Sequence, residues 1–219
     1  LHDVADRLVL DRAQLRPAQH LDAGRVAEVS RQIVRPRLRD IAGIHVEGEI
    51  GQLLRVAKRA HGFGMRILYC GPRRLGEVDE QALGMTYTTL ERVLAHADFV
   101  SLHAALKPET RHLIGAYELS LMKSTAFLIN TSRGPIVDEE ALIAALRDRR
   151  IAGAGLDVFE DEPSVSPELT AMPNVVLTPH MGSAVLELRE MMANCVVANI
   201  DAILKGGRPP NCINPEVFA

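Results

Sequence analysis

The chain has 219 residues, of which 47% are hydrophobic and 24% are charged, with a formal net charge of −3 at pH 7. This composition is typical of a globular protein, and the length allows one large domain or two small ones. The slightly acidic balance gives no basic field for nucleic acid or for an anionic membrane surface. Aromatic residues make up only 4% of the chain, too few for base-stacking platforms. We therefore expect neither nucleic acid nor a membrane as a partner.

The sequence also indicates the compartment. No apolar run approaches the roughly 18 residues that span a bilayer. The first residues lack the basic and apolar stretches of a signal peptide, and the missing initial Met suggests a trimmed or fragmentary chain. Cys70, Cys195 and Cys212 are scattered, which favours free thiols in a reducing compartment, and neither they nor the histidines have metal-type spacing. We expect a cytoplasmic protein without a metal site.

Short apolar runs alternate with helical patterns from about residue 42 onward. Continuous apolar runs are typical of strands buried on both faces, and the helices between them indicate βαβ units. We predict an α/β fold with a doubly wound, Rossmann-like parallel sheet, whose strands end on one edge where ligands bind. The expected strands cover residues 43–46, 66–70, 99–103, 126–130, 155–158 and 175–178.

Four helix boundaries are predicted from capping signals. The helix that begins near residue 50 should stop at Gly62 and Gly64. Asp138 should be the N-cap of the next clear helix. Ser183 should cap a long C-terminal return helix, whose apolar stripe runs from residue 185 to 204 and which ends at the Lys-Gly-Gly of residues 205–207.

A glycine-rich turn follows the first expected strand. Gly48 and Gly51 stand at the second and third positions of a G-x-G-x-x-G pattern, whereas Val46 stands at the first. The second glycine lets the backbone approach a pyrophosphate, and the third permits close packing of helix on strand. Val46 resists positive φ, and Glu47 and Glu49 add negative charge, so we expect weakened dinucleotide binding. The alternative is a plain structural turn.

The second strand is followed by a cationic turn. An NAD site usually has an acidic residue here, which accepts a hydrogen bond from the ribose 2′-hydroxyl. This chain has Gly71 instead, with Arg73 and Arg74 just beyond it. Guanidinium groups pair well with a 2′-phosphate, which favours NADP(H) over NAD(H). The alternative is a solvated turn.

Three candidate catalytic residues follow successive apolar runs. Arg133 has the planar fork that binds a carboxylate and polarises a carbonyl. His180 is suited to exchange a proton with a carbonyl oxygen, and Glu162 would orient its imidazole. Asp161 and Glu160 are nearby alternatives to Glu162. If Glu162 is the partner, those two should face solvent.

Two further polar residues end expected strands. His103 either lines a cofactor cleft or is a core or hydrogen-bonded histidine. Asp157 lies where a carboxylate is costly unless it is hydrogen-bonded, so contact with a nicotinamide carboxamide is attractive.

From about residue 40 to 215, the chain resembles the D-isomer-specific 2-hydroxyacid dehydrogenases. The likeness is dense in residues 100–114, 126–134, 153–163 and 173–180. It implies that Arg133 binds the substrate carboxylate and carbonyl, that His180 is the acid/base, and that Glu162 tunes it. The turn at 71–74 and the ending at 207–215 look most like the glyoxylate/hydroxypyruvate reductase branch. The implied cofactor contacts come from Gly48, Glu49, Ile50, Gly51, Ala105, Thr110, Thr131, Asp157 and Gly182.

The chain departs from the family pattern in three places. Val46 replaces the first glycine, Ala105 stands where the family often has Pro, and the substrate domain is largely missing. We expect an N-terminal helical segment (1–40) leading into the cofactor domain, a dinucleotide-binding domain (41–183), and a helix and tail belonging to the substrate domain (184–219). Without a substrate domain, the apolar stripe of the C-terminal helix would be exposed, which predicts a homodimer. The alternative function is a catalytically silent dinucleotide-sensing module, like the corepressor relatives of the family.

Overall fold

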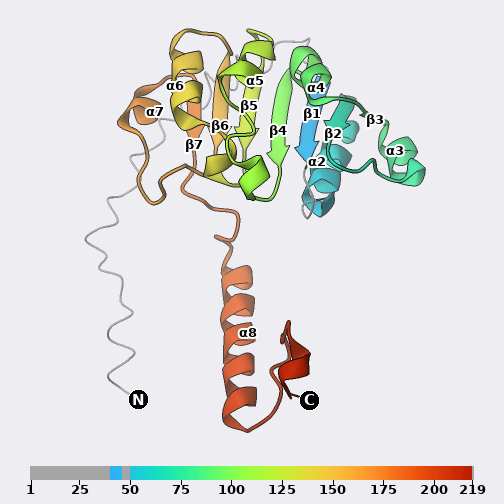
Figure 1. Cartoon of the computed structure of the whole chain (residues 1–219), viewed down its shortest axis with the longest axis vertical. Coiled ribbons are helices and arrows are strands. Elements are labelled where there is room, and N and C mark those ends of the chain that lie inside the picture. Colours follow the sequence, from blue (N-terminus) through green and yellow to red (C-terminus); the bar gives the residue numbers. More distant parts are fainter. Residues whose placement is uncertain (1–39, 46–49, 219) are drawn as a thin grey trace.

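The computed structural model describes residues 40–45 and 50–218, so Val46, Glu47, Gly48, Glu49 and the segment before Asp40 lie outside the described residues. Seven strands, all paired in parallel, form one sheet in the order β3-β2-β1-β4-β5-β6-β7 (Figure 1). The doubly wound parallel sheet is confirmed. The strands are β1 (Asp40–His45), β2 (Arg66–Cys70), β3 (Met85–Tyr87), β4 (Phe99–His103), β5 (Phe127–Asn130), β6 (Gly153–Leu156) and β7 (Val175–Leu177).

The sequence pattern missed one strand and misplaced two others, since β1 begins at Asp40, three residues before the expected start. Strand β3 has only three residues, and two of them are exposed, so it leaves no continuous apolar run to detect. Strand β6 begins at Gly153 and ends at Leu156, earlier than expected, because the following residues already belong to the loop at the edge of the sheet.

Helices cover both faces of the sheet. Alternation along β2 separates two cores, because successive side chains of a strand point to opposite faces. Ile67 and Tyr69 join the core on the side of α2, whereas Cys70 joins the larger core on the other side. Helices α4, α5 and α6 form a layer on that second side (Figure 1). The helices are α2 (Ile50–Gly62), α3 (Glu77–Leu83), α4 (Leu90–His96), α5 (Ala116–Leu121), α6 (Glu139–Arg147) and α7 (Pro167–Ala171).

Two of the predicted helix boundaries are confirmed. Helix α2 ends at Gly62, and Gly64 follows with a φ of 69°, a left-handed conformation that glycine adopts at little cost. Asp138 is the N-cap of α6, and its side chain accepts a hydrogen bond from the Ala141 N–H at 3.0 Å.

The three cysteines are free, as expected. Burial, and secondarily the charge of Glu91, raise the pKa of the Cys70 thiol to about 12.

The C-terminal helix α8 (Leu186–Leu204) begins later than the sequence suggested. Val185 is its N-cap, and Ser183 instead uses its carbonyl to accept a hydrogen bond from Arg189 Nε at 3.0 Å, so the prediction for Ser183 was wrong. The C-terminal end of α8 is as predicted, with Lys205 as the C-cap and Gly206 at a φ of 73°.

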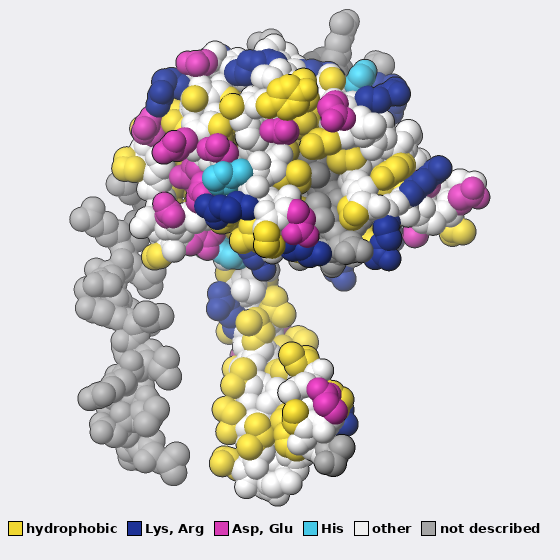
Figure 2. Space-filling model, in the orientation of Figure 1, with side chains coloured by type: hydrophobic (Ala, Val, Ile, Leu, Met, Phe, Trp, Pro, Cys, Tyr) yellow, Lys and Arg dark blue, Asp and Glu magenta, His cyan; other side chains and the backbone are white. Residues whose placement is uncertain are grey.

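Helix α8 projects away from the sheet, and the C-terminal segment returns beside it (Figure 1). The backbone N–H of Asn211 donates to the Asn199 side chain at 3.1 Å, which fixes this return. None of the residues of α8 is buried, and hydrophobic side chains lie exposed along its length (Figure 2). Neither α8 nor any other helix within residues 50–218 combines the length and hydropathy needed to cross a bilayer.

Because α8 exposes so much apolar surface, we expect the chain to self-associate. Val196 and Ile200 are 56% and 53% exposed, one helical turn apart. Replacing both by glutamate should shift the sedimentation profile toward the monomer without changing the circular dichroism of the sheet domain. A wild-type chain that stays monomeric at high concentration would contradict this expectation.

Candidate functional site

The candidate site is built on the carboxyl ends of β5, β6 and β7, which are neighbours in the sheet. After β5, Asn130 forms a tight turn. Its side-chain oxygen accepts the Ser132 N–H at 3.1 Å, and its side-chain nitrogen donates to the Arg133 carbonyl at 3.0 Å. The Ser132 hydroxyl donates to the Leu102 carbonyl at 2.7 Å, which anchors the turn to β4. Arg133 is left exposed on this rigid turn, with its Nη1 donating to the Ser132 carbonyl at 2.6 Å.

Glu162 and His180 meet across the loops that follow β6 and β7. Oxygen Oε2 of Glu162 lies 2.8 Å from Nδ1 of His180, and Oε1 accepts the Phe159 N–H at 3.0 Å. One oxygen of the Glu162 carboxylate is therefore fixed by the Phe159 N–H while the other contacts the imidazole. His180 has a φ of 51°, a left-handed conformation that is uncommon for residues other than glycine. Such backbone positions cluster at functional sites.

The charges around Glu162 favour its ionised form. Partial burial raises the pKa of Glu162, but the hydrogen bonds from His180 and the Phe159 N–H outweigh this effect. The positive charges of His180 and Arg133 act in the same direction, and the pKa lies below its ordinary value. A carboxyl group with a lowered folded-state pKa keeps its pairing above the unfolded pKa, and loses it as the pH falls through the folded one. We therefore expect protonation of Glu162 to release His180 only at a pH below the range in which an ordinary glutamate titrates.

Asp157 ties the ends of β6 and β7 together. Its Oδ1 accepts hydrogen bonds from the Thr178 hydroxyl at 2.5 Å and from the Met181 N–H at 2.9 Å. These two contacts bracket His180 in the sequence, so they fix the backbone on either side of the imidazole. The side chain of Asp157 is half-buried, which agrees with the hydrogen bonding expected for an acid at this position.

Gly134 brings the Arg133 turn against the loop that carries Glu162. A Cβ built on Gly134 would lie 1.8 Å from the Phe159 carbonyl oxygen. Only a residue without a side chain fits this approach, and it places the guanidinium-bearing turn directly beside the carboxylate-bearing loop.

The expectation that Glu160 faces solvent was wrong, whereas Asp161 is exposed as expected. The side chain of Glu160 is only 20% exposed, and its Oε1 lies 2.7 Å from both Arg111 Nη2 and His112 Nε2. Glu160 is thus held by the loop that follows β4, nearly fifty positions away in the chain. Its backbone N–H also donates to Glu139 Oε2 at 3.1 Å, at the start of α6.

Replacing Glu160 by glutamine should lower the free energy of unfolding by about 1 kcal/mol, because charge-assisted hydrogen bonds are lost at a partly exposed site. Urea denaturation measures this loss. Replacing the exposed neighbour Asp161 by asparagine is the matched control and should leave the stability unchanged. Equal stabilities for the two variants would show that the Glu160 contacts contribute nothing.

The cofactor side of the site lies where the strand order reverses, between β1 and β4. Dinucleotides bind at this crevice, at the amino end of the helix after the first strand. Ile50 begins that helix, and no described atom lies within 4 Å of a Cβ built on Gly51. The close packing expected of Gly51 is therefore not found among the described residues. The first turn of α2 has no acidic residue, which suits an anion at its amino end.

The other expected cofactor residues occupy different environments. His103 is fully buried, which agrees with the core alternative. The Thr110 hydroxyl donates to the Ala105 carbonyl at 2.7 Å and accepts the Lys107 N–H at 2.8 Å, so it shapes its own loop. Thr131 and Gly182 are exposed at the strand ends.

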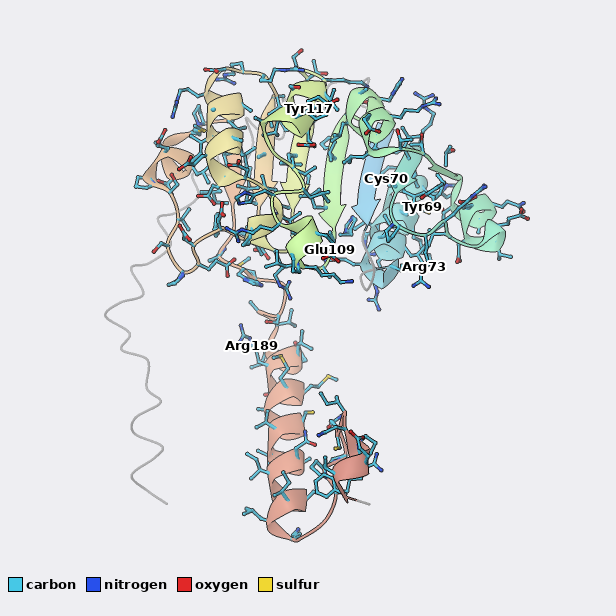
Figure 3. All side chains as sticks on the ribbon, viewed as in Figure 1. Tyr69, Cys70, Arg73, Glu109, Tyr117 and Arg189 are labelled. Atoms are coloured by element: carbon cyan, nitrogen blue, oxygen red, sulfur yellow. The ribbon has the colours of Figure 1, made fainter. Side chains whose placement is uncertain are left out.

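The turn after β2 is held by contacts of its own. The Gly71 carbonyl accepts a hydrogen bond from the Tyr87 hydroxyl at 2.6 Å. Arg73 is exposed and lies on the side of the sheet where β1 and β4 end (Figure 3). Arg74, in contrast, turns to Glu80 and forms an ion pair with it at 2.7 Å. Arg74 thus has a carboxylate partner within the described residues, and the role expected of Arg73 and Arg74 in cofactor binding stays a prediction.

Sequence reasoning missed the residues that support the site. Asn130 and Ser132 lie within the Asn-Thr-Ser-Arg-Gly string that identified Arg133, and their turn-forming side chains were the available signal. No local signal marked the contacts of Glu160 or Glu80. Among residues 40–45 and 50–218, no group of three or more histidine, cysteine or acidic side chains could hold a metal ion.

Comparison with known proteins identifies the family. The model for the NAD binding domain of D-isomer specific 2-hydroxyacid dehydrogenases matches residues 12–182. A glyoxylate reductase of Thermococcus litoralis is 53% identical over 176 residues, which are 80% of this chain and 52% of that protein. The chain thus spans about half the length of the curated relatives that it matches.

Solved structures agree. A glyoxylate reductase from Paecilomyes thermophila has a TM-score of 0.66 and 40% identity, covering 77% of this chain and 50% of that one. The D-lactate dehydrogenase of Escherichia coli has a TM-score of 0.69 and 32% identity, covering 79% of this chain and 54% of that one. The chain therefore belongs to the D-isomer specific 2-hydroxyacid dehydrogenases and carries the NAD binding domain of that family.

Proposed function

We propose that this chain acts as an NAD(P)-dependent oxidoreductase on a small 2-keto or 2-hydroxy acid of the glyoxylate or hydroxypyruvate type. The observation that carries the proposal is the 2.8 Å contact between Glu162 and His180, beside the exposed guanidinium of Arg133. A carboxylate-oriented imidazole next to a guanidinium suits proton exchange with the carbonyl of a bound acid. The relatives' names point to the same substrate class.

Each residue has a defined task in this proposal. Arg133 pairs with the substrate carboxylate and polarises the adjacent carbonyl. His180 donates a proton to the carbonyl oxygen in reduction and removes it in oxidation, through Nε2, because Nδ1 faces Glu162. Glu162 holds the imidazole orientation and stabilises its charged form. The nicotinamide, when bound, supplies or accepts the hydride.

The cofactor would lie across the ends of β1, β2 and β4. The amino end of α2 at Ile50 and Gly51 would face the pyrophosphate, together with the turn at Gly48 and Glu49, which lies outside the described residues. NADP(H) is favoured over NAD(H), because Gly71 stands after β2 where NAD sites have an acidic residue, and the cationic Arg73 follows it. Asp157 and Thr131 would lie near the nicotinamide end.

The rest of the molecule fits the same proposal. Residues 41–183 would form the cofactor domain, and residues 184–219 would belong with a substrate domain, in a cytoplasmic homodimer. The apolar side chains exposed along α8 support this assignment, because they would be covered by a partner surface.

The experiment combines turnover and binding on the full chain. NADPH oxidation is followed with glyoxylate or hydroxypyruvate, beside a fluorescence titration of NADPH and NADH. Turnover supports the enzyme, with NADPH bound more tightly than NADH. Binding without turnover would instead support a silent dinucleotide-sensing module, which the Glu162–His180 pair does not favour. Absence of both would overturn the proposal.

A further inference from the structure

Glu160 joins three segments that are far apart in the sequence. Its Oε1 lies 2.7 Å from Arg111 Nη2 and 2.7 Å from His112 Nε2, both in the loop after β4. Its Oε2 accepts the N–H of Glu139, the first residue of α6, at 3.4 Å, and its own N–H donates to Glu139 Oε2 at 3.1 Å. We call these four residues (Arg111, His112, Glu139 and Glu160) the Glu160 cluster.

The Glu160 cluster brings two carboxylates together and compensates their charge with donors. The side chain of Glu160 is only 20% exposed, so it is more shielded than a carboxylate on the open surface. His112 Nε2 must carry a proton here, because a carboxylate only accepts hydrogen bonds. The amino end of α6 also favours negative charge. The loop that carries Arg111 lies at the edge of the sheet where the strands end, as the neighbouring Glu109 shows (Figure 3).

The loop after β4 also holds the backbone of the turn that carries the candidate guanidinium. The His112 N–H donates to the Pro135 carbonyl at 2.8 Å, and the Ile114 N–H donates to the Ile136 carbonyl at 3.1 Å. The Asp138 N–H donates back to the Ile114 carbonyl at 3.0 Å. His112 has a φ of 53°, a left-handed conformation that is uncommon for residues other than glycine. The cluster therefore fixes this loop where it runs beside the turn.

The peptide between Phe159 and Glu160 separates the two halves of the candidate site. A Cβ built on Gly134 would lie 1.8 Å from the Phe159 carbonyl oxygen and 2.6 Å from the Glu160 nitrogen, so this peptide packs directly on the turn after β5. The Phe159 N–H donates to Glu162 Oε1 at 3.0 Å. Any shift of Glu160 thus moves the peptide that lies between the Arg133 turn and the Glu162 carboxylate.

We propose that Glu160 is a positioning residue, which sets the spacing between the Arg133 guanidinium and the Glu162–His180 pair, and that the rest of the Glu160 cluster acts through it. The inference rests on the proposed function, because it assumes that both groups engage one small acid. The carboxylate and the carbonyl oxygen of such an acid are close together, so the spacing tolerates little error. A misplacement of about 1 Å can lower a rate by about 10²-fold.

A positioning role predicts a particular kinetic signature. Binding of the substrate carboxylate requires only Arg133, in the ground state and in the transition state alike. Proton exchange requires that His180 reach the carbonyl oxygen while the carboxylate stays bound. A relaxed spacing should therefore lower kcat and leave KM for the acid nearly unchanged. A contact that only stabilises the fold would lower the free energy of unfolding without changing kcat of the folded chain.

The test measures kcat and KM for glyoxylate, with NADPH and with NADH, on the full chain under conditions where every variant is folded. Glu160→Gln and Arg111→Gln should each lower kcat by about tenfold, and KM should stay within about twofold of wild type. The double variant should be no slower than the slower single variant, because both changes release the same cluster. Asp161→Asn, at the exposed neighbouring position, is the matched control and should change neither constant.

His112→Asn provides a second route should Glu160→Gln fold poorly. Asparagine tolerates the left-handed backbone of His112 but lacks the ring that reaches Glu160, so kcat should fall in this variant too. A kcat of the Glu160 and His112 variants equal to that of Asp161→Asn would refute the positioning role. A rise in KM at unchanged kcat would overturn it as well, because the cluster would then act on substrate binding alone.

Hydrogen exchange separates this inference from the proposed function. The peptide that contains Phe159 should exchange faster in Glu160→Gln and Arg111→Gln than in wild type, and at the wild-type rate in Asp161→Asn. Unchanged exchange in all three variants would show that Glu160 does not hold this peptide, and would overturn the inference. A wild-type chain without turnover on glyoxylate or hydroxypyruvate would overturn the proposed function and the catalytic part of the inference, whereas the exchange rates would still decide whether the cluster fixes the loop.

Discussion

Replacing His180 by glutamine is expected to lower kcat by about 10²- to 10⁴-fold, the usual contribution of a positioned general acid or base. The amide keeps the polar contact toward Glu162 but has no proton to exchange at neutral pH. Cofactor affinity should stay near its wild-type value, because the role proposed for His180, which contacts Glu162, is proton exchange and not cofactor binding. Steady-state kinetics with NADPH and glyoxylate, together with fluorescence titration, measure the two effects separately.

A matched control is available on α4. His96 is exposed and its ring contacts the Arg92 carbonyl at 2.9 Å, far along the chain from the candidate site. His96→Gln should leave kcat unchanged. Glu162→Gln should give an intermediate loss, since the imidazole remains but loses its charged partner. A kcat of the His180 variant equal to that of the His96 variant would refute the acid/base role of His180.

Replacing Gly134 by alanine is the second change with a large expected effect. A Cβ at this position would lie 1.8 Å from the carbonyl oxygen and 2.0 Å from the carbonyl carbon of Phe159. Both atoms belong to backbone, so no side chain can turn away and the loop itself must move. We expect a loss of about 2 to 3 kcal/mol in the free energy of unfolding, at the upper end of overpacking substitutions.

The same displacement of the loop should also lower kcat. Phe159 donates its N–H to Glu162 at 3.0 Å, so moving its peptide disturbs the carboxylate that contacts His180. Gly76→Ala is the control, because a Cβ there meets nothing within 4 Å and its φ of −66° suits alanine. Urea denaturation and kcat are measured for both variants. Wild-type stability in Gly134→Ala would mean that the two loops are not packed as described.

The sequence predicted the fold where apolar runs were long. Strands β2, β4 and β5 stand out because each is a run of mostly apolar residues that are mostly buried or half-buried, and together with the intervening helices they specify a parallel sheet. Strand β3 was missed because it has only three residues, two of them exposed, which is too short a run to show a period. The start of α8 was misplaced because Ser183 has the chemistry of a cap, yet its loop ends three residues later.

The sequence predicted the residues of the candidate site but not the side-chain contacts that hold the surrounding loops in place. Arg133, Glu162 and His180 follow successive strands, and parallel topology places such residues on one edge. The fates of Glu160 and Arg74 depend on which charged group faces which after folding. Glu160 meets Arg111 across the sheet edge, and Arg74 meets a carboxylate on the next helix. No local pattern encodes those choices, because an exposed arginine and a paired one look alike in sequence.

The two outermost strands have a consequence for how copies of the chain can meet. Strands β3 and β7 close the sheet on either side, and each has only three residues. Such short borders offer few unpaired backbone groups, so they discourage another molecule from extending the sheet by strand addition. Molecules of this protein that come together should therefore do so through side chains of the projecting helix, and they should form discrete assemblies and not fibrils.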